Sequence, residues 1–347
     1  MLYVTTRGKH DVFTASITMN QDRGPDGGLF IPFRMPSFEK AQILQLADKS
    51  MGQNIADILN LFFSSKLTSW DVDMAIGRFL LEFKPINYRV VVAEVWHNMD
   101  QSFDRVVRSL AEKIHPDGDI IGDPSDWMQI AIRIAVLFGI FGELLRTGQI
   151  TYEKPINVAV SAGNFAAPMA AWYARQMGLP IDTIICGCNE NGAPWELLHR
   201  GELDTAAAVI PTSTPEGDHA VPAGLERLIC GACGLEQTMD LCWCCSEGAT
   251  YVPDGEAHSA MREGMFAAVV SQVRVDTIIP SVYRTNQYVL DMYASLAYGA
   301  LSDYRSRTGK STTTLLIAEK CPLVQAEAVA HTMRISVQEL KKRVMEG

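Results

Sequence analysis

Apolar and polar residues are distributed along this chain in blocks that predict both strands and helices. Short apolar runs rich in β-branched residues predict buried strands, whereas longer segments with apolar residues three and four positions apart predict helices. The predicted strands are residues 2–6, 89–94, 156–160, 182–186 and 312–318. The predicted helices are residues 38–48, 55–63, 70–83, 103–114, 127–147, 166–178, 194–200, 224–233, 257–273 and 285–305, followed by two short helices. Asn54 is expected to cap the second helix, and Asp123 or Ser125 the fifth.

Residues 155–191 are the centre of this prediction. A strand, a helix and a second strand follow one another there within roughly thirty residues, which is the length of a βαβ unit. Because such crossovers are right-handed, the two strands are expected to be parallel neighbours. The turn before the helix, residues 161–164, would present backbone N–H groups that can bind an anion. A plain tight turn accounts for the same residues.

The composition is that of a globular protein with an extensive core. Of the 347 residues, 48% are hydrophobic and 20% are charged, which suits one large or two ordinary domains. The net charge of −10, without basic runs, argues against a nucleic-acid partner. The longest apolar stretch, residues 130–145, contains Arg133 and Glu143 and is too short to span a bilayer. The first residues lack the apolar segment of a signal peptide, so we expect a cytoplasmic protein that binds no membrane.

Several stretches, in a shared order, resemble the threonine synthases, which are pyridoxal-phosphate enzymes of fold type II. LYVTTRG at residues 2–8 and RGPDGGLFIP at residues 23–32 resemble the N-terminal signature of that family. VAVSAGNF at residues 158–165 is similar to its phosphate-binding segment. The resemblance continues through MGLPI (177–181), CNEN (188–191), TSTPEGD (212–218) and GLERL (224–228).

The resemblance implies an α/β fold with an open, mostly parallel sheet and helices on both faces, as in the larger domain of the tryptophan synthase β-subunit-like enzymes. A small α-rich N-terminal region would accompany it. Residues 1–94 would form the N-terminal region and residues 127–347 the large α/β domain. Members of the family convert O-phosphohomoserine to threonine with pyridoxal phosphate.

The chain departs from the family pattern at four places that concern the cofactor. Asp104 stands where the family has the lysine that forms the Schiff base, and a carboxylate cannot form an imine. Residues 95–126 would be the remnant of a deleted smaller domain. Ala166 and Ala167 replace a Gly-Asp pair, and each added Cβ narrows the approach of a phosphate. Ala318 replaces the threonine that partners the pyridine nitrogen.

We therefore expect a threonine synthase-like protein without catalytic activity, in which the cofactor is absent or vestigial. The residues expected at the vestigial binding site are Ser161, Ala162, Gly163, Asn164, Phe165, His97, Asn189 and Lys320. A small anionic ligand is one expected partner. A second copy of the chain is another, because loss of the smaller domain would uncover apolar surface.

Two other functions remain open. One is an active lyase or synthase that binds the cofactor non-covalently or through Lys320, which follows the last predicted strand, although a solvent-facing loop lysine is the simpler interpretation. A zinc or thiol function would use a group of closely spaced cysteines. These are Cys230, Cys233, Cys242, Cys244 and Cys245. Free cysteine also packs as a small hydrophobe, and that is the simpler interpretation, so no metal site is assigned.

Overall fold

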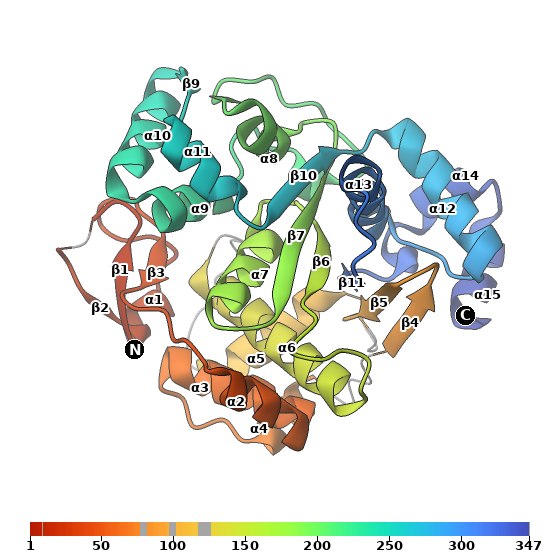
Figure 1. The fold of residues 1–347 in the computed structure, drawn as a ribbon, viewed down its shortest axis with the longest axis horizontal. Coiled ribbons are helices and arrows are strands. Elements are labelled where there is room, and N and C mark those ends of the chain that lie inside the picture. Colours follow the sequence, from red (N-terminus) through yellow and green to blue (C-terminus); the bar gives the residue numbers. More distant parts are fainter. Residues whose placement is uncertain (9, 77–81, 97–101, 117–125, 347) are drawn as a thin grey trace.

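A six-stranded sheet forms the centre of the computed structural model, which describes residues 1–8, 10–76, 82–96, 102–116 and 126–346 (Figure 1). Its strand order is β10-β7-β6-β11-β5-β4. Neighbouring strands are parallel except at one edge, where β4 pairs antiparallel with β5. The strands are β4 (Glu82–Ile86), β5 (Val90–Glu94), β6 (Ile156–Ser161), β7 (Ile181–Cys188), β10 (Met265–Val269) and β11 (Thr314–Ala318). The expected mostly parallel sheet is confirmed.

The predicted βαβ unit is present as β6, α7 (Ala166–Gln176) and β7. β6 and β7 are parallel neighbours, with Val160 opposite Cys186. Both strands are apolar along nearly their whole length because helices cover both faces of the sheet.

Alternate side chains of each strand contribute to two separate hydrophobic clusters, one on each face. Val158 and Val160 pack on the first face, and Ala159 packs on the second. The helices of the first face are α3 (Met51–Phe63), α5 (Phe103–Ile114), α6 (Trp127–Arg146), α7 and α9 (Gly224–Cys233). The helices of the second face are α12 (Gln272–Asn286), α13 (Met292–Thr308), α14 (Ala326–Met333) and α15 (Val337–Glu346).

Helix α6 lies in the middle of the first face. Of the helices that the structure describes, it is the one whose length and composition would allow it to cross a membrane. However, 78% of its most apolar window is buried inside the protein, as in the central helix of a globular core.

On the second face, α13 packs very close to β7 at Gly187. A Cβ added to Gly187 would lie only 2.2 Å from the backbone carbon of Leu296. The helix can approach the strand this closely because Gly187 has no side chain.

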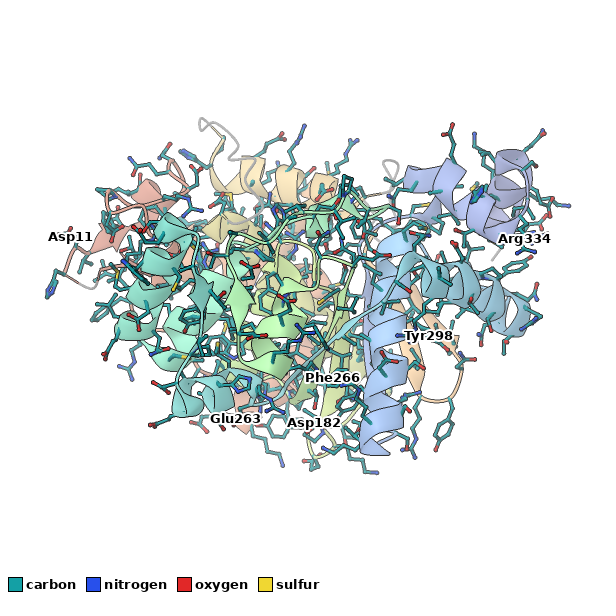
Figure 2. The ribbon with its side chains drawn as sticks, turned by 90° about the horizontal axis from the view of Figure 1, so that it is seen from above. Asp11, Asp182, Glu263, Phe266, Tyr298 and Arg334 are labelled. Atoms are coloured by element: carbon teal, nitrogen blue, oxygen red, sulfur yellow. The ribbon has the colours of Figure 1, made fainter. Side chains whose placement is uncertain are left out.

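The N-terminal region is α-rich, as expected, and also contains a small antiparallel sheet of order β2-β1-β3. The Tyr3 hydroxyl donates a 2.6 Å hydrogen bond to the carbonyl of Phe62, which joins this sheet to α3. Its elements are β1 (Leu2–Thr5), β2 (Phe13–Thr14), α1 (Ala15–Thr18), β3 (Phe30–Pro32), α2 (Lys40–Leu44), η1 (Gln45–Asp48), α3 and α4 (Ser69–Ala75). Seen from above, Asp11 in this region and Arg334 between α14 and α15 lie at opposite ends of the molecule (Figure 2).

The segment between β7 and β10 forms a separate group of short elements beside the central sheet (Figure 1). Its two-stranded sheet pairs β8 with β9. The elements are α8 (Ala193–Trp195), the π-helical turn η2 (Glu196–Arg200), β8 (Leu203–Asp204), η3 (Pro215–Gly217), α9, α10 (Leu235–Glu247), β9 (Thr250–Tyr251) and α11 (Gly255–Arg262). A further turn, η4 (Pro322–Gln325), follows β11.

Two helix predictions were wrong. The helix predicted at residues 70–83 ends at Ala75, and residues 82–83 belong to strand β4; residues 77–81 lie outside the described residues. The helix predicted at residues 257–273 is divided into α11 and strand β10. Gly264, with a φ of 68°, lies between these two elements, and a left-handed residue ends a helix.

The ends of three other helices also differ from the prediction. Ser50, not Asn54, caps α3, since its hydroxyl accepts a hydrogen bond from the N–H of Gln53. Asp126 caps α6 in place of Asp123 or Ser125, which lie outside the described residues. The helix predicted at residues 285–305 begins later, at Met292, because α12 extends to Asn286.

Candidate functional site

A cavity of about 500 Å³ opens where the carboxyl ends of β6 and β11 face α5 and α6. In open α/β sheets, ligands bind outside the carboxyl ends of the strands, so this is the expected place for a site. The lining residues that offer charged or hydrogen-bonding groups include Asp104, Arg133, Ser161, Asn164, Glu216, Glu319 and Lys320, together with the backbone of Gly163.

One wall of the cavity is the loop between β6 and α7. Two of its residues are left-handed, Gly163 with a φ of 46° and Phe165 with a φ of 74°. The Ala166 N–H donates to the side-chain oxygen of Asn164 (3.2 Å), which fixes the start of α7. Within the described residues, the N–H groups of Gly163 and Asn164 donate to no protein acceptor, and the buried hydroxyl oxygen of Ser161 has no hydrogen-bond partner. These free donors at a helix start can bind an anion.

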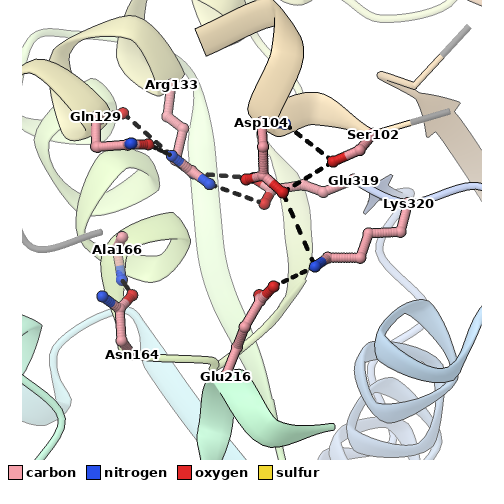
Figure 3. Close-up of polar contacts among 9 residues, drawn as sticks. All are labelled: Ser102, Asp104, Gln129, Arg133, Asn164, Ala166, Glu216, Glu319 and Lys320. Atoms are coloured by element: carbon pink, nitrogen blue, oxygen red, sulfur yellow. Dashed lines mark hydrogen bonds and ion pairs between the residues drawn. The ribbon is translucent and has the colours of Figure 1, made fainter. Parts of the chain in front are cut away.

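A second wall carries a buried ion pair between Arg133 of α6 and Glu319, which follows β11. The guanidinium donates two hydrogen bonds of 3.1 Å to the two carboxylate oxygens and a further 2.9 Å bond to Gln129 (Figure 3). Burial lowers the pKa of Arg133, but the charge of Glu319 outweighs this and raises the pKa above its ordinary value. Arg133 therefore remains a charged guanidinium, and its contact with Glu319 ties α6 to the segment after β11.

Lys320 lies next to this pair and joins three separate parts of the chain. Its ammonium contacts the Glu216 carboxylate of turn η3 and lies 4.0 Å from an oxygen of Asp104 at the start of α5 (Figure 3). It also lies 4.7 Å from the centre of the Tyr293 ring. Burial lowers the pKa of Lys320, but the charges of Glu216 and Asp104 and the hydrogen bond to Glu216 reverse this effect and raise it. Lys320 is therefore an ammonium ion near neutral pH.

The backbone holds Asp104 and Lys320 together as well. Ser102 and Lys320 form an isolated antiparallel bridge, and the Phe103 N–H donates a 2.9 Å hydrogen bond to the carbonyl of Glu319. The start of α5 and the end of β11 are thus one structural unit.

Asp291 lies buried at the start of α13, next to Tyr293. Its side chain caps the helix by accepting hydrogen bonds from the N–H groups of Tyr293 (2.8 Å) and Ala294 (3.0 Å). Burial raises the pKa of Asp291 to about 7, although these two hydrogen bonds and the charge of Lys320 act in the opposite direction. Asp291 therefore titrates close to neutral pH.

The structure brings most of the predicted site residues together. Ser161, Ala162, Gly163, Asn164, Asp104 and Lys320 all line the cavity. Phe165 does not, because its side chain is buried in the core of the first face. His97 lies outside the described residues. The interpretation of Lys320 as a solvent-facing loop residue was wrong, since its side chain is only 13% exposed.

Asn189 holds the loop of residues 212–218 rather than lining the cavity. Its amide donates hydrogen bonds to the hydroxyl of Thr212 (2.9 Å) and the carboxylate of Asp218 (2.8 Å). Asn189 is 3% exposed, and this buried network fixes the loop that carries Glu216 to the mouth of the cavity.

Ala318 was expected beside the cofactor, at the position of the partner of the pyridine nitrogen, but it does not line the cavity. Its side chain packs in the hydrophobic cluster of the second face, on the opposite side of the sheet from the cavity. Ile317 and Glu319, its neighbours along the chain, line the cavity instead. This alternation follows from the two-residue repeat of a strand.

Arg133, Glu216, Glu319 and Tyr293 were not singled out by the sequence patterns as site residues. For Arg133 and Glu319, the sequence contains features that could have identified them. Arg133 interrupts the most apolar stretch of the chain, and a charged residue in such a helix faces a partner or a cavity. Glu319 directly follows a buried strand, where the carboxyl ends of parallel strands place ligand-binding residues.

The cysteines give no support to a metal centre. All eight are free thiols. In the described part of the chain, no group of three or more His, Cys, Asp or Glu side chains is placed to hold a metal ion. Cys230 and Cys244 are buried, and Cys242 and Cys245 lie on α10 with pKa values raised by burial.

Comparison with known proteins finds similar proteins in sequence and in fold. A family model described as the threonine synthase N terminus matches residues 2–78. Threonine synthase-like 1 of Pongo abelii is 25% identical over 176 residues, and its Mus musculus counterpart is 30% identical over 103 residues. The chain is similar in sequence to threonine synthases and threonine synthase-like proteins. These alignments cover 50% and 29% of this chain, and the chain spans only 24% and 14% of the two relatives.

Solved threonine synthases share the fold of this chain. The pyridoxal-phosphate-bound threonine synthase from Brucella melitensis has a TM-score of 0.84 at 18% identity, covering 96% of this chain and 91% of that chain. Threonine synthase from yeast has a TM-score of 0.82 at 15% identity, covering 99% and 94%. The α/β fold expected from the sequence is confirmed by these structures.

Proposed function

We propose that this chain is a threonine synthase-like protein that binds a small anionic ligand in the 500 Å³ cavity and does not make threonine. The observation that carries the proposal is the state of Lys320, the one lysine among the described residues that line the cavity. Its amine is protonated near neutral pH, and the carboxylates of Glu216 and Asp104 balance the charge of the resulting ammonium. A protonated amine is not a nucleophile.

The phosphate end of pyridoxal phosphate fits the residues present. The free N–H groups of Gly163 and Asn164 and the unpartnered hydroxyl of Ser161 are the groups that would hold a phosphate. The cavity volume also lies within the range of about 300–1,000 Å³ that is typical of small-molecule sites. An anionic ligand is therefore compatible with this wall.

The covalent end of the cofactor does not fit. The family resemblance aligns Asp104 with the lysine that attaches the cofactor, and Asp104 has no amine. The nearest amine, that of Lys320, is held by two carboxylates. The residue aligned with the partner of the pyridine nitrogen, Ala318, faces the other side of the sheet. These observations support an anion site without the family's covalent chemistry.

The decisive test measures cofactor attachment and turnover on the purified chain. The protein is incubated with pyridoxal phosphate, treated with borohydride and analysed by intact-mass spectrometry, with a catalytically active threonine synthase in parallel. We expect no borohydride-fixed adduct and no threonine from O-phosphohomoserine. A stoichiometric adduct or sustained threonine formation would show that the proposal is wrong.

A second candidate function has one observation in its favour. The Lys320 amine lies 4.0 Å from the Asp104 carboxylate, in the same cavity as the loop of residues 161–165. A lysine just after β11 could therefore take over the role that the family gives to a lysine at the position of Asp104, on α5. This function predicts an adduct that forms with the wild-type protein but not with Lys320→Arg. Lys310→Arg, on an exposed loop, is the matched control.

We also propose that the chain forms a homo-oligomer. Several large apolar side chains are more than half exposed in the single chain, among them Phe33, Trp70 and Trp243. Light scattering after size-exclusion chromatography tests this directly. A monodisperse monomer at micromolar concentration would contradict it.

A further inference from the structure

We infer that copies of this chain assemble head to tail, with the outer face of α10 in one copy bound to the outer face of α15 in the next. The inference rests on the homo-oligomer proposed above and names the two surfaces that would form it. The occupant of each surface is thus a second copy of the same chain.

The outer face of α10 combines exposed apolar side chains with acidic ones. Met239 and Trp243 are about one helical turn apart and are 46% and 61% exposed. The acidic residues of the same helix are exposed as well, and in the described part of the chain none of them forms an ion pair. They are Glu236, Asp240 and Glu247. These five residues are called the acidic face of α10 below.

Few cations are available to balance the acidic face of α10. Residues 228–261 contain no lysine or arginine. The charges of Arg7 and Arg23 reach α10 at Cys242, where they act on the thiol. However, Arg7 donates hydrogen bonds of 3.1 and 2.9 Å to Glu226, which engages its charge. The acidic face of α10 therefore attracts a cationic partner.

The outer face of α15 has the complementary composition. Lys341 and Lys342 lie four and three positions before Met345, so the three side chains share one side of the helix. All three are exposed, and Met345 is exposed by 81%. Leu340, in contrast, is buried on the inner side. The three outer residues are called the basic face of α15 below.

The other charges of α15 leave this end of the chain positive. Arg343 donates a 2.8 Å hydrogen bond to Glu339 one turn earlier, so these two charges balance. Glu346, the other acid of the helix, offsets one of the two lysines. Arg334 is exposed just before the helix and adds a further positive charge.

The apolar groups of the two faces also suit each other. A lysine ammonium over a tryptophan ring gains a cation–π attraction, and a methionine sulfur packs favourably against an aromatic ring. Trp243 of one copy could therefore receive both a lysine and Met345 of the next. Asp240 and Glu247 would accept charge-assisted hydrogen bonds from the lysines. Two acidic faces would instead bring like charges together, which opposes a symmetric contact through α10.

The two faces cannot meet within one chain. α10 and α15 lie toward opposite ends of the long axis of the molecule (Figure 1). A contact between unlike surfaces leaves one free face at each end of a pair. Assembly would therefore continue to a ring or to an open chain, whereas a contact between like surfaces would stop at a dimer.

The test uses variants that each disable one face, followed by light scattering after size-exclusion chromatography. Trp243→Ser removes the aromatic centre of the acidic face, and Lys341→Glu/Lys342→Glu reverses the charge of the basic face. We expect each change to weaken association at least about tenfold, as for the central residues of an interface. An equimolar mixture of the two variants should form a 1:1 dimer and nothing larger, because it retains a single intact interface.

Matched controls separate this interface from other exposed residues. Trp70→Ser removes a 64% exposed tryptophan from α4, and Lys154→Glu/Lys310→Glu makes the same change of charge on exposed loops. Both should associate as the wild type does. Raising the salt from about 0.05 M to about 0.5 M should weaken wild-type association, because salt screens exposed charges. Circular dichroism of each variant verifies that it is folded.

The outcomes that overturn the inference leave the homo-oligomer proposal separately testable. If the wild type associates but either single-face variant associates equally well, or if the mixture forms no dimer, the head-to-tail contact is wrong and the homo-oligomer stands. Loss of association in Trp70→Ser would place the interface at α4 instead. A monodisperse wild-type monomer at micromolar concentration would refute the homo-oligomer and this inference together.

Discussion

The ion pair between Arg133 and Glu319 makes the strongest quantitative prediction. Glu319→Gln keeps the shape of the side chain but removes the charge that accepts two 3.1 Å hydrogen bonds from the guanidinium. Arg133 is only 10% exposed and Glu319 only 23% exposed, so the remaining charge would be buried without its direct partner, with the charges of Asp104 and Glu216 as its remaining compensation. Breaking a buried pair in this way costs about 3–5 kcal/mol. Because Glu319 is partly exposed, we expect the lower end of this range, about 3 kcal/mol of unfolding free energy.

The matched control is the pair Arg274–Asp303, which has similar geometry but a more exposed arginine. Its two hydrogen bonds are both 2.8 Å long, but the side chains are 38% and 27% exposed. Asp303→Asn should therefore cost no more than about 1 kcal/mol. Urea unfolding followed by circular dichroism measures both variants, and a common slope shows that the unfolded states are comparable. If Glu319→Gln costs no more than Asp303→Asn, the assignment of a buried, structurally important pair is wrong.

Three further predictions test other parts of the structure. Gly187→Ala should lower the unfolding free energy by about 3 kcal/mol or more, because the new Cβ would collide with the backbone of Leu296. Gly255→Ala is the control, since the space around Gly255 is open, and it should leave the melting temperature nearly unchanged. The pKa of Asp291 is raised to about 7 in the folded state, so its protonated form stabilises the fold at low pH and this contribution is lost as the pH rises from about 4 through 7. Asp291→Asn, which keeps a capping oxygen, should therefore gain stability relative to the wild type over that interval; a parallel pH dependence of the two proteins would contradict the burial of an ionisable group there. EDTA should leave the melting temperature unchanged, and metal analysis should find no stoichiometric zinc. A loss of stability on chelation would instead support a zinc site at the cysteines.

The central unit of the fold could be predicted from the sequence because its signals are local and consistent. β6, α7 and β7 combine apolar β-branched runs with a helix that is bounded by turn residues. Parallel pairing then follows from the handedness of the crossover. The same logic placed Ser161, Gly163 and Asn164 at the carboxyl edge of the sheet, where the cavity lies.

The wrong predictions arose where distant contacts decide the structure. The segment of residues 265–269 is apolar enough for either a helix or a strand, and its pairing with β7 makes it a strand. In a similar way, nothing near Lys320 in the sequence indicates burial. Its partners Glu216 and Asp104 are more than one hundred residues away, and only the fold brings them together. Sequence patterns predicted the cavity wall formed by the single loop between β6 and α7. They missed the wall formed by Asp104, Glu216 and Lys320, which come from three distant segments.

The bridge between Ser102 and Lys320 also determines the surroundings of any residue introduced at position 104. Restoring a lysine at position 104 would place a second ammonium within roughly the 4.0 Å that now separates Asp104 from Lys320. Like charges at that distance repel and lower each other's pKa values. A lysine introduced at position 104 would therefore meet repulsion where Asp104 now meets attraction, since Asp104 and Lys320 are each part of the other's electrostatic environment.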